Sequence, residues 1–477
     1  MKHLREFGFV VFLLAALVAG CSQPGPADST DPTITAFNVM VAAADHITAS
    51  VTATDNVGVT SVTVSVDGGA ATSATKGAGD TWTWLSAAPF AAGAHEVAAT
   101  ARDAAGNTAT ATPITVIVGG SVAATQVTAG LWSSMALGVD GSVHAWGSNF
   151  DGRVGLGDDD SDRDTPEQVA GLASITALAG ATANGFAVDA DGDAYSWGNS
   201  SLLGFAATED GVEPAQIPGL SDIVQIATGG AHALALDANG TVYGWGDNLY
   251  GQLGLGFTNP NYFETPQEIT GLNGIVIVQI SAGGSHSMAL SSAGDVYSWG
   301  RGDSGRLGHG NSDNLSVPTL IVGLSDVMRV AAGGNHSLAR DLDGNVYAWG
   351  DNGTGQLGLN DENNRDVPTQ VAALTDISFI AVGLNNSFAV DGDGNLYSWG
   401  QNTAGQLGLG DAVDRDEPEQ VTGLPDIAWV AASAFHTVAA DWDGNVYAWG
   451  RNDNGELGVG DTVERDTPTH VPYFGGG

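Results

Sequence analysis

Apolar and polar residues alternate with period two over most of the chain, which predicts short β-strands rather than helices. Within residues 32–118 this alternation is clearest in five runs: His46–Thr54, Val59–Val66, the run around Trp82 and Trp84, His95–Arg102 and Thr108–Val118. The second run stops at Asp67-Gly68-Gly69, which is a hairpin signal. Six or so short strands in this length predict a small antiparallel β-sandwich.

Two turn segments of this region, Asp55-Asn56-Val57-Gly58-Val59 and Arg102-Asp103-Ala104-Ala105-Gly106-Asn107, are similar to those of bacterial Ig-like domains of surface proteins. The resemblance implies an Ig-like β-sandwich over residues 32–118. Its expected role is that of a spacer that holds the next domain away from a membrane. A ligand-binding role is the alternative.

The rest of the chain, residues 119–477, repeats one unit. The dipeptide Trp-Gly recurs at spacings of 51, 48, 54, 50, 50 and 50 residues, at Trp146, Trp197, Trp245, Trp299, Trp349, Trp399 and Trp449. A period near 50 with Gly and aromatic landmarks is typical of propeller blades or of a solenoid. The copy over residues 377–421 divides into four strands, so seven copies predict an all-β, seven-bladed β-propeller.

Shared motifs give this repeat a family resemblance. Gly-Gly-x-His, Tyr-x-Trp-Gly, Gly-Gln-Leu-Gly-Leu and Pro-x-x-Val resemble the repeat of the regulator-of-chromosome-condensation family, most completely at Gly333–His336, Tyr347–Gly350 and Gly355–Leu359. The founding member of that family is an exchange factor for a small nuclear GTPase, and a secreted bacterial relative inhibits β-lactamases. The resemblance therefore implies a propeller that binds proteins.

The ends of the repeat region suggest how the ring closes. The region opens at a first-strand position, Thr125–Ala129, and ends on a Pro-x-x-Val strand, Pro468–Val471. We expect that C-terminal strand to complete the first blade and thereby remove both open edges. Ring closure would also make the first and seventh blades neighbours.

Four histidines occupy one slot of the repeat, 13 residues before the tryptophan: His232, His286, His336 and His436. The other three copies place Ser133, Asn184 and Asn386 there. Serine and asparagine form hydrogen bonds but are poor transition-metal ligands. The slot therefore predicts a structural hydrogen bond, and we expect neither a metal site nor a cofactor.

Two acidic or basic motifs also recur. Asp-x-Asp-Gly, as in Asp391–Gly394, resembles the start of a calcium loop but lacks the glutamate that an EF-hand needs at position 12, so hairpin turns are the favoured interpretation. Arg-Asp-x-Pro occurs at Arg163, Arg365, Arg415 and Arg465. An ion pair or carbonyl clamp that orders a long loop is the preferred role for these arginines, with a carboxylate-binding site as the alternative.

Charge narrows the function further. The chain has 14 Lys+Arg against 54 Asp+Glu, a net charge of −40, which leaves no basic stripe for nucleic acid or for an anionic membrane surface. No Ser-His-Asp elbow, phosphate loop or cysteine nucleophile is present. We therefore expect a non-enzyme and a monomer.

The N-terminus predicts export. Residues 1–20 combine a positive start, an apolar run and the small residues before Cys21, the sole cysteine, which resembles a bacterial lipobox. Lipidation of Cys21 would anchor the protein to the cell envelope, at the outer membrane or cell surface, and the membrane would be contacted only through this anchor. Residues 21–31 have the composition of a flexible tether.

The corner before the histidine slot carries Trp132 in the first copy and Phe435 in the seventh, so ring closure would bring these two aromatics together. Phe150 and Tyr250 lie in loops on the same face, and Trp442 lies in a turn on the opposite face. Aromatic anchors with a polar rim are typical of protein-binding hot spots, although packing between loops is the alternative. We expect a surface-anchored scaffold for an unidentified protein partner; alternatives are a carbohydrate or cell-wall binding module and a propeller lyase.

Overall fold

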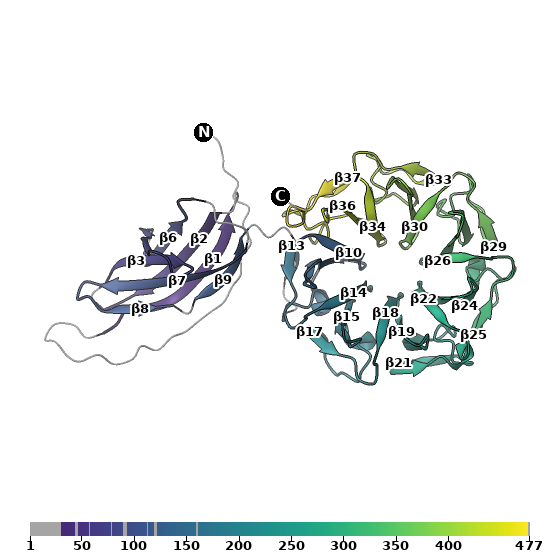
Figure 1. Cartoon of the computed structure of the whole chain (residues 1–477), viewed down its shortest axis with the longest axis horizontal. Helices are drawn as coiled ribbons and strands as arrows, with labels where there is room; N and C mark the ends of the chain where they lie inside the picture. Colours follow the sequence, from purple (N-terminus) through teal and green to yellow (C-terminus); the bar gives the residue numbers. More distant parts are fainter. Residues whose placement is uncertain are drawn as a thin grey trace. The chain divides into compact units, whose positions relative to one another are not determined.

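A computed structural model describes residues 30–42, 46–56, 58–77, 79–88, 93–111, 113–118, 122–158 and 161–475. The chain divides into two compact units, Met1–Gly120 and Ser121–Gly477 (Figure 1). The predicted signal segment, Cys21 and the tether up to residue 29 lie outside the described residues. Among the described residues, no helix is both long enough and apolar enough to cross a bilayer.

The first unit consists of two antiparallel sheets. One has the order β1-β2-β6-β5 and the other the order β4-β3-β7-β8, with β9 also pairing with β7. Their bounds are β1 Thr33–Ala42, β2 His46–Thr54, β3 Val59–Val66, β4 Thr72–Ser73, β5 Thr75–Lys76, β6 Thr81–Leu85, β7 Gly93–Asp103, β8 Thr108–Thr110 and β9 Ile114–Val118.

The core of this unit lies between the two sheets. Phe37, Val51 and Trp82 from one sheet and Val62 and Val97 from the other belong to one buried cluster. The strands predicted at residues 46–54 and 59–66 are confirmed to the residue. The predicted run 108–118 is instead two strands, because the chain leaves the sheet around Pro113, which has no N–H for a strand ladder.

In its described part, the second unit contains seven four-stranded antiparallel sheets, each built from consecutive strands. Figure 1 shows them around a central axis, with the first strand of each sheet at the centre and the fourth at the rim. The innermost strands are β10 Ala124–Ala129, β14 Ile175–Gly180, β18 Ile223–Thr228, β22 Ile277–Ala282, β26 Val327–Ala332, β30 Ile377–Val382 and β34 Ile427–Ala432.

The remaining strands follow in the same order in every sheet. The second strands are β11 Ser133–Gly138, β15 Asn184–Asp189, β19 His232–Asp237, β23 His286–Ser291, β27 His336–Asp341, β31 Asn386–Asp391 and β35 His436–Asp441. The third are β12 Val143–Gly147, β16 Ala194–Gly198, β20 Val242–Asn248, β24 Val296–Gly300, β28 Val346–Gly350, β32 Leu396–Gly400 and β36 Val446–Gly450. The fourth are β13 Arg163–Gln168, β17 Gly211–Gln216, β21 Asn259–Glu268, β25 Leu315–Leu320, β29 Arg365–Gln370, β33 Arg415–Gln420 and β37 Arg465–His470. Short 3₁₀ turns lie at η1 Phe150–Gly152, η2 Ser200–Leu202, η3 Thr270–Leu272 and η4 Asp303–Gly305.

The repeated Trp-Gly dipeptide explains how neighbouring sheets pack. All seven tryptophans have no exposed surface. Six of the seven indole N–H groups donate to a backbone carbonyl of the preceding sheet, as Trp399 does to the Gln356 oxygen at 3.0 Å. The glycine that follows each tryptophan has a positive φ and lies against the neighbouring strand, so a Cβ on Gly350 would come within 2.6 Å of the Asn335 oxygen.

The predicted closure through the C-terminal strand is wrong. β37 pairs with β36 in the last sheet, and the outer edge of the first sheet is filled by β13, which contains Pro166. In each of the seven sheets the Pro-x-x-Val or Pro-x-x-Ile strand pairs with the third strand of its own sheet, so no strand is left over to exchange.

The ring closes instead by repeating the ordinary junction between sheets. Trp146 donates to the Glu456 backbone oxygen at 2.8 Å, as five of the other six tryptophans do at their own junctions. Phe474, 1 % exposed, packs 5.7 Å from the Trp146 ring and forms an isolated parallel bridge with Val122. The beginning and the end of the ring therefore meet through Phe474, its contact with Trp146 and one isolated bridge, rather than through a strand shared by two sheets.

Candidate functional site

The ring has two faces, because antiparallel strands reverse direction at each connection. We call corner face the end that carries the connections from first to second strand and from third to fourth strand. We call turn face the end that carries the turns from second to third strand and the links to the next sheet. Hydrogen bonds support this sorting: Ala190 in such a turn donates to the Ser174 oxygen in the preceding link at 3.0 Å.

On the corner face, Trp132 and Phe435 lie together across the junction of the first and last sheets, as the sequence predicted. Their ring centroids are 5.5 Å apart with an interplanar angle of 30°. Both side chains are partly exposed. Arg451 completes the group, with its guanidinium 4.7 Å from the Trp132 ring and 5.6 Å from the Phe435 ring. We call these three residues the seam cluster.

An aspartate beside the rings holds the Arg451 guanidinium in place. Asp453 accepts from its Nε at 2.6 Å and pairs with its Nη2 at 2.5 Å, with the Asp453 side chain half exposed. Glu456 lies nearby with no exposed surface, and its burial raises the pKa of this carboxyl. The seam cluster therefore presents aromatic surface and a guanidinium plane whose charge is largely balanced, a composition suited to a protein hot spot.

Sequence reasoning missed Arg451, although a signal existed. Arginine follows Trp-Gly in only two of the seven copies, at Arg301 and Arg451. The other copy forms a similar arrangement: Arg301 lies 4.7 Å from the Tyr250 ring and donates to Asp303 at 2.7 Å. Tyr250, predicted as a contact residue, thus belongs to a separate group on the third and fourth sheets.

The remaining predicted contact residues stand apart from the seam cluster. Phe150 is 69 % exposed, and its ring lies 5.9 Å from the buried Arg153. Trp442 is 77 % exposed and lies on the turn face. The structure therefore unites Trp132 and Phe435 but connects neither Phe150, Tyr250 nor Trp442 to them by a ring contact in the described residues.

Histidines at this position of the repeat connect neighbouring sheets by a hydrogen bond to a serine, a pair that we call a staple. This confirms the predicted structural hydrogen bond. Each histidine Nε2 meets a serine Oγ of the following sheet at 2.9–3.0 Å: His232 with Ser287, His286 with Ser337, His336 with Ser387, and His436 with Ser134. Each serine in turn donates to a backbone carbonyl, such as Ser387 to the Gln356 oxygen. Because the serine hydrogen is used there, Nε2 must be the protonated nitrogen of the ring.

Burial determines the charge of these four histidines. It lowers the pKa of His232 to about 4 and those of His336 and His436 to about 3, and it holds the pKa of His286 well below the usual value. The rings are therefore neutral at neutral pH. The copies without histidine also lack the serine partner, since Ser133 faces Gly185, Asn184 faces Ala233 and Asn386 faces Thr437 at the same places of the repeat.

Both recurring charged motifs have local structural roles. In the Asp-x-Asp-Gly turns the first aspartate caps the hairpin: Asp391 accepts from the Asn395 N–H at 2.9 Å and from Asn395 Nδ2 at 2.9 Å. Arg415 pairs with Asp411 at 2.8 Å and donates to the Val413 oxygen, which is both an ion pair and a carbonyl clamp. Arg163, Arg365 and Arg465 repeat this arrangement.

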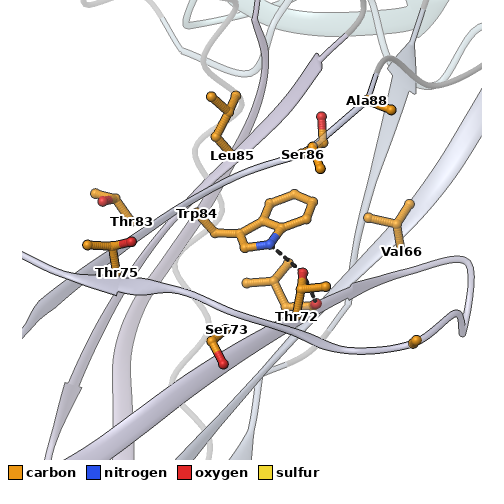
Figure 2. Close-up of a pocket in the computed structure, with 12 residues that line it drawn as sticks. Val66, Thr72, Ser73, Thr75, Thr83, Trp84, Leu85, Ser86 and Ala88 are labelled. Atoms are coloured by element: carbon orange, nitrogen blue, oxygen red, sulfur yellow. Dashed lines mark hydrogen bonds between the residues drawn. The ribbon is translucent and has the colours of Figure 1, made fainter.

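The first unit contains a cavity that the sequence did not predict. Its volume is about 510 Å³, and its lining includes Val64, Thr72, Leu85 and Ser86 around Trp84 (Figure 2). The Trp84 indole donates to Thr72 Oγ1 at 2.6 Å, which fixes the ring in the opening. None of the described residues that line the cavity is charged.

Comparison with known protein families shows which family this chain belongs to. A family model described as "RCC1-like domain" matches residues 42–329, and models of the "Regulator of chromosome condensation (RCC1) repeat" match residues 343–390, 393–440 and 443–477. The chain belongs to the RCC1-like domain family. The first of these matches begins inside the first unit, whereas the repeated sheets begin at Ala124.

Solved structures agree with this assignment. Human WBSCR16 is 25 % identical, with a TM-score of 0.63 over 69 % of this chain and 93 % of that chain. Prp20p of Saccharomyces cerevisiae is 26 % identical, with a TM-score of 0.63 over 71 % of this chain and 87 % of that chain. The all-β RCC1-like propeller predicted from the repeat is thereby confirmed, while an Ig-like kinship of the first unit stays a prediction.

Curated relatives match over part of this chain. The human E3 ubiquitin-protein ligase HERC2 is 34 % identical over 198 residues, which is 40 % of this chain and 4 % of HERC2. The ultraviolet-B receptor UVR8 of Arabidopsis thaliana is 35 % identical over 202 residues, 41 % of this chain and 45 % of UVR8. This chain thus spans less than half the length of these relatives, so their whole-protein activities do not follow from the match.

Proposed function

We propose that this protein is a non-catalytic scaffold whose corner face binds a partner protein at the seam cluster. The observation that carries the proposal is the stack of Trp132 on Phe435 with Arg451 lying against both rings. Trp, Tyr and Arg dominate binding hot spots because they combine large contact area with directional polar groups.

Related structures support a protein-binding role. The structure of yeast Prp20p was described with its binding to Gsp1p and histones, and a second structure shows yeast RCC1 (Prp20) with Kap60 bound. These named partners bind Prp20 and are not assigned to this chain. What we carry over is the kind of ligand, a folded protein or protein segment.

The test is affinity capture from the native host with the full chain, followed by binding of the purified partner. We expect Trp132→Ala/Phe435→Ala to weaken that binding at least tenfold, and Tyr262→Ala, at an exposed position of the outer strand β21, to leave it within twofold. Unchanged affinity of the double variant would remove the seam cluster as the site. Near-ultraviolet circular dichroism then checks that both variants keep the native packing.

A carbohydrate ligand is the competing use of the same rings, since aromatic side chains also stack on sugars. A glycan array probed with the full chain separates the two: a glycan bound by the wild type and lost in the double variant would replace the protein partner in this proposal. The first unit then serves as a spacer in either case.

We also propose that Cys21 is lipidated and anchors the protein to the cell envelope. The proposal rests on the small residues and apolar run before the sole cysteine. Mass spectrometry of the mature N-terminal peptide tests it. We expect a diacylglyceryl group on Cys21, and an unmodified cysteine or an intact residue 1–20 segment would exclude the anchor.

A further inference from the structure

The turn face carries large apolar side chains that the fold does not require. At the second position of the turn between second and third strands, Val139, Leu342 and Trp442 are 71 %, 63 % and 77 % exposed. The other four sheets hold small residues at this position: Ala190, Ala238, Ser292 and Gly392. Since small residues form the same turn, the tryptophan and leucine are not there for packing.

Carboxylates surround these apolar side chains. The first aspartate of each Asp-x-Asp-Gly turn is used as a cap, but the second and the aspartate just before the innermost strand are exposed. Among the described residues, no hydrogen bond or ion pair reaches the carboxylates of Asp191, Asp343, Asp393, Asp443, Asp222, Asp326, Asp376 and Asp426. Residues of the turns and of the links between sheets include no lysine or arginine.

Packing between sheets brings some of the residues that carry these carboxylates next to each other. A Cβ on Gly394 would lie 2.6 Å from the Asp426 Cβ, so Asp393 and Asp426 are neighbours across the junction of the sixth and seventh sheets. Gly192 lies in the same way against Asp222 and brings Asp191 beside it. These junctions therefore gather exposed negative charge, which a cationic ligand complements.

The spacing of the carboxylates favours separate cationic groups over one metal ion. In the described part of the chain, no group of three or more His, Cys, Asp or Glu side chains is placed to hold a metal. Ammonium or guanidinium groups on a polypeptide can each meet one or two carboxylates. Such a segment also suits Trp442, because an exposed indole face attracts a Lys or Arg side chain.

We propose that the turn face binds a lysine- and arginine-rich segment of a partner protein, with Trp442 as its anchor and the junction aspartates as its counter-charges. This surface lies at the opposite end of the sheets from the seam cluster. The chain thus acts as a two-sided adaptor, and each face is testable without the other.

The test is fluorescence anisotropy of a fluorescein-labelled ten-residue peptide of alternating Lys and Arg, titrated with the full chain in moderate salt. We expect Asp393→Asn/Asp426→Asn/Asp443→Asn to weaken binding at least tenfold, and Trp442→Ala to weaken it three- to tenfold. Affinity of the wild type should fall steeply as sodium chloride is raised, because each ion pair is partly screened.

A matched control separates this face from the overall negative charge. Glu362→Gln/Glu417→Gln/Glu464→Gln removes the same charge from exposed positions outside the turn face. We expect that control to bind within twofold of the wild type. Three results would each overturn the proposal. The first is equal weakening by both triple variants, and the second is wild-type affinity of Trp442→Ala for the peptide. The third is displacement of the peptide by calcium chloride but not by sodium chloride of equal ionic strength. None of these results bears on the seam cluster.

Discussion

The junction between the sixth and seventh sheets lacks a histidine–serine staple, and installing one should stabilise the ring. Asn386 fills the histidine slot there with no exposed surface, and neither atom of its amide group has a hydrogen-bond partner. Thr437 stands where the other junctions have serine, and its hydroxyl donates to the Gln406 oxygen at 2.8 Å. The perturbation is Asn386→His combined with Thr437→Ser.

The size of the effect follows from the hydrogen bonds at the four existing staples. A buried polar atom without a partner costs about 1–3 kcal/mol, and a new hydrogen bond contributes about 1 kcal/mol. The exchange replaces two unpartnered atoms by one, because Nδ1 stays without a partner in three of the native staples. Gly383 leaves room for the ring, as Gly229, Gly283 and Gly333 do before the native histidines. We therefore expect a gain of about 1–3 kcal/mol in the free energy of unfolding.

Urea denaturation at pH 8, followed by the fluorescence of the buried tryptophans, measures this gain as a shift of the midpoint at unchanged slope. The reverse exchange, His336→Asn with Ser387→Thr, should lower the midpoint by a similar amount. The gain in unfolding free energy should shrink as the pH falls below about 6.5, the ordinary pKa of histidine. Below that pH the unfolded chain protonates the new histidine, whereas the buried ring of the folded chain stays neutral. A double variant no more stable than the wild type at pH 8 would refute the staple as a source of stability.

Four further predictions test other parts of the ring. Gly350→Ala should destabilise it by about 2–4 kcal/mol, because φ is +108° and the new Cβ meets backbone, whereas Gly353→Ala, with nothing within 4 Å, should stay within about 0.5 kcal/mol in urea denaturation. Phe474→Ala should cost about 3–5 kcal/mol and speed hydrogen exchange at both chain ends of the ring, since the side chain is buried against Trp146; slow exchange there would contradict the closure described. The native protein should lose stability between about pH 6.5 and pH 3, because burial lowers the pKa of His336 and His436 to about 3 while the unfolded chain protonates near 6.5; a flat profile in calorimetry over this range would count against it. Arg415→Gln should raise protease cleavage within residues 401–414 while changing global stability by less than about 1 kcal/mol, as expected for a partly exposed ion pair.

The sequence by itself determined the local structure of this protein. Alternation at period two specified strands, as in His46–Thr54, and Asp-Gly specified the hairpin turns, because both depend on neighbouring residues only. Seven copies of Trp-Gly determined the repeat, since one sheet cannot bury its tryptophan without the sheet before it in the ring. Substitution among the copies also indicated that the histidines form structural hydrogen bonds, which the staples confirm.

Tertiary structure alone decided how the ring closes and what surrounds its aromatic residues. The sequence suggested that the last strand joins the first sheet, but β13 already fills that edge. A count of strands along the chain does not reveal which edge each strand occupies. Arg451 meets Trp132 across more than three hundred residues of sequence, so no local pattern predicts their contact. The same holds for the carboxylates of the turn face, because their spacing depends on the packing of one sheet against the next.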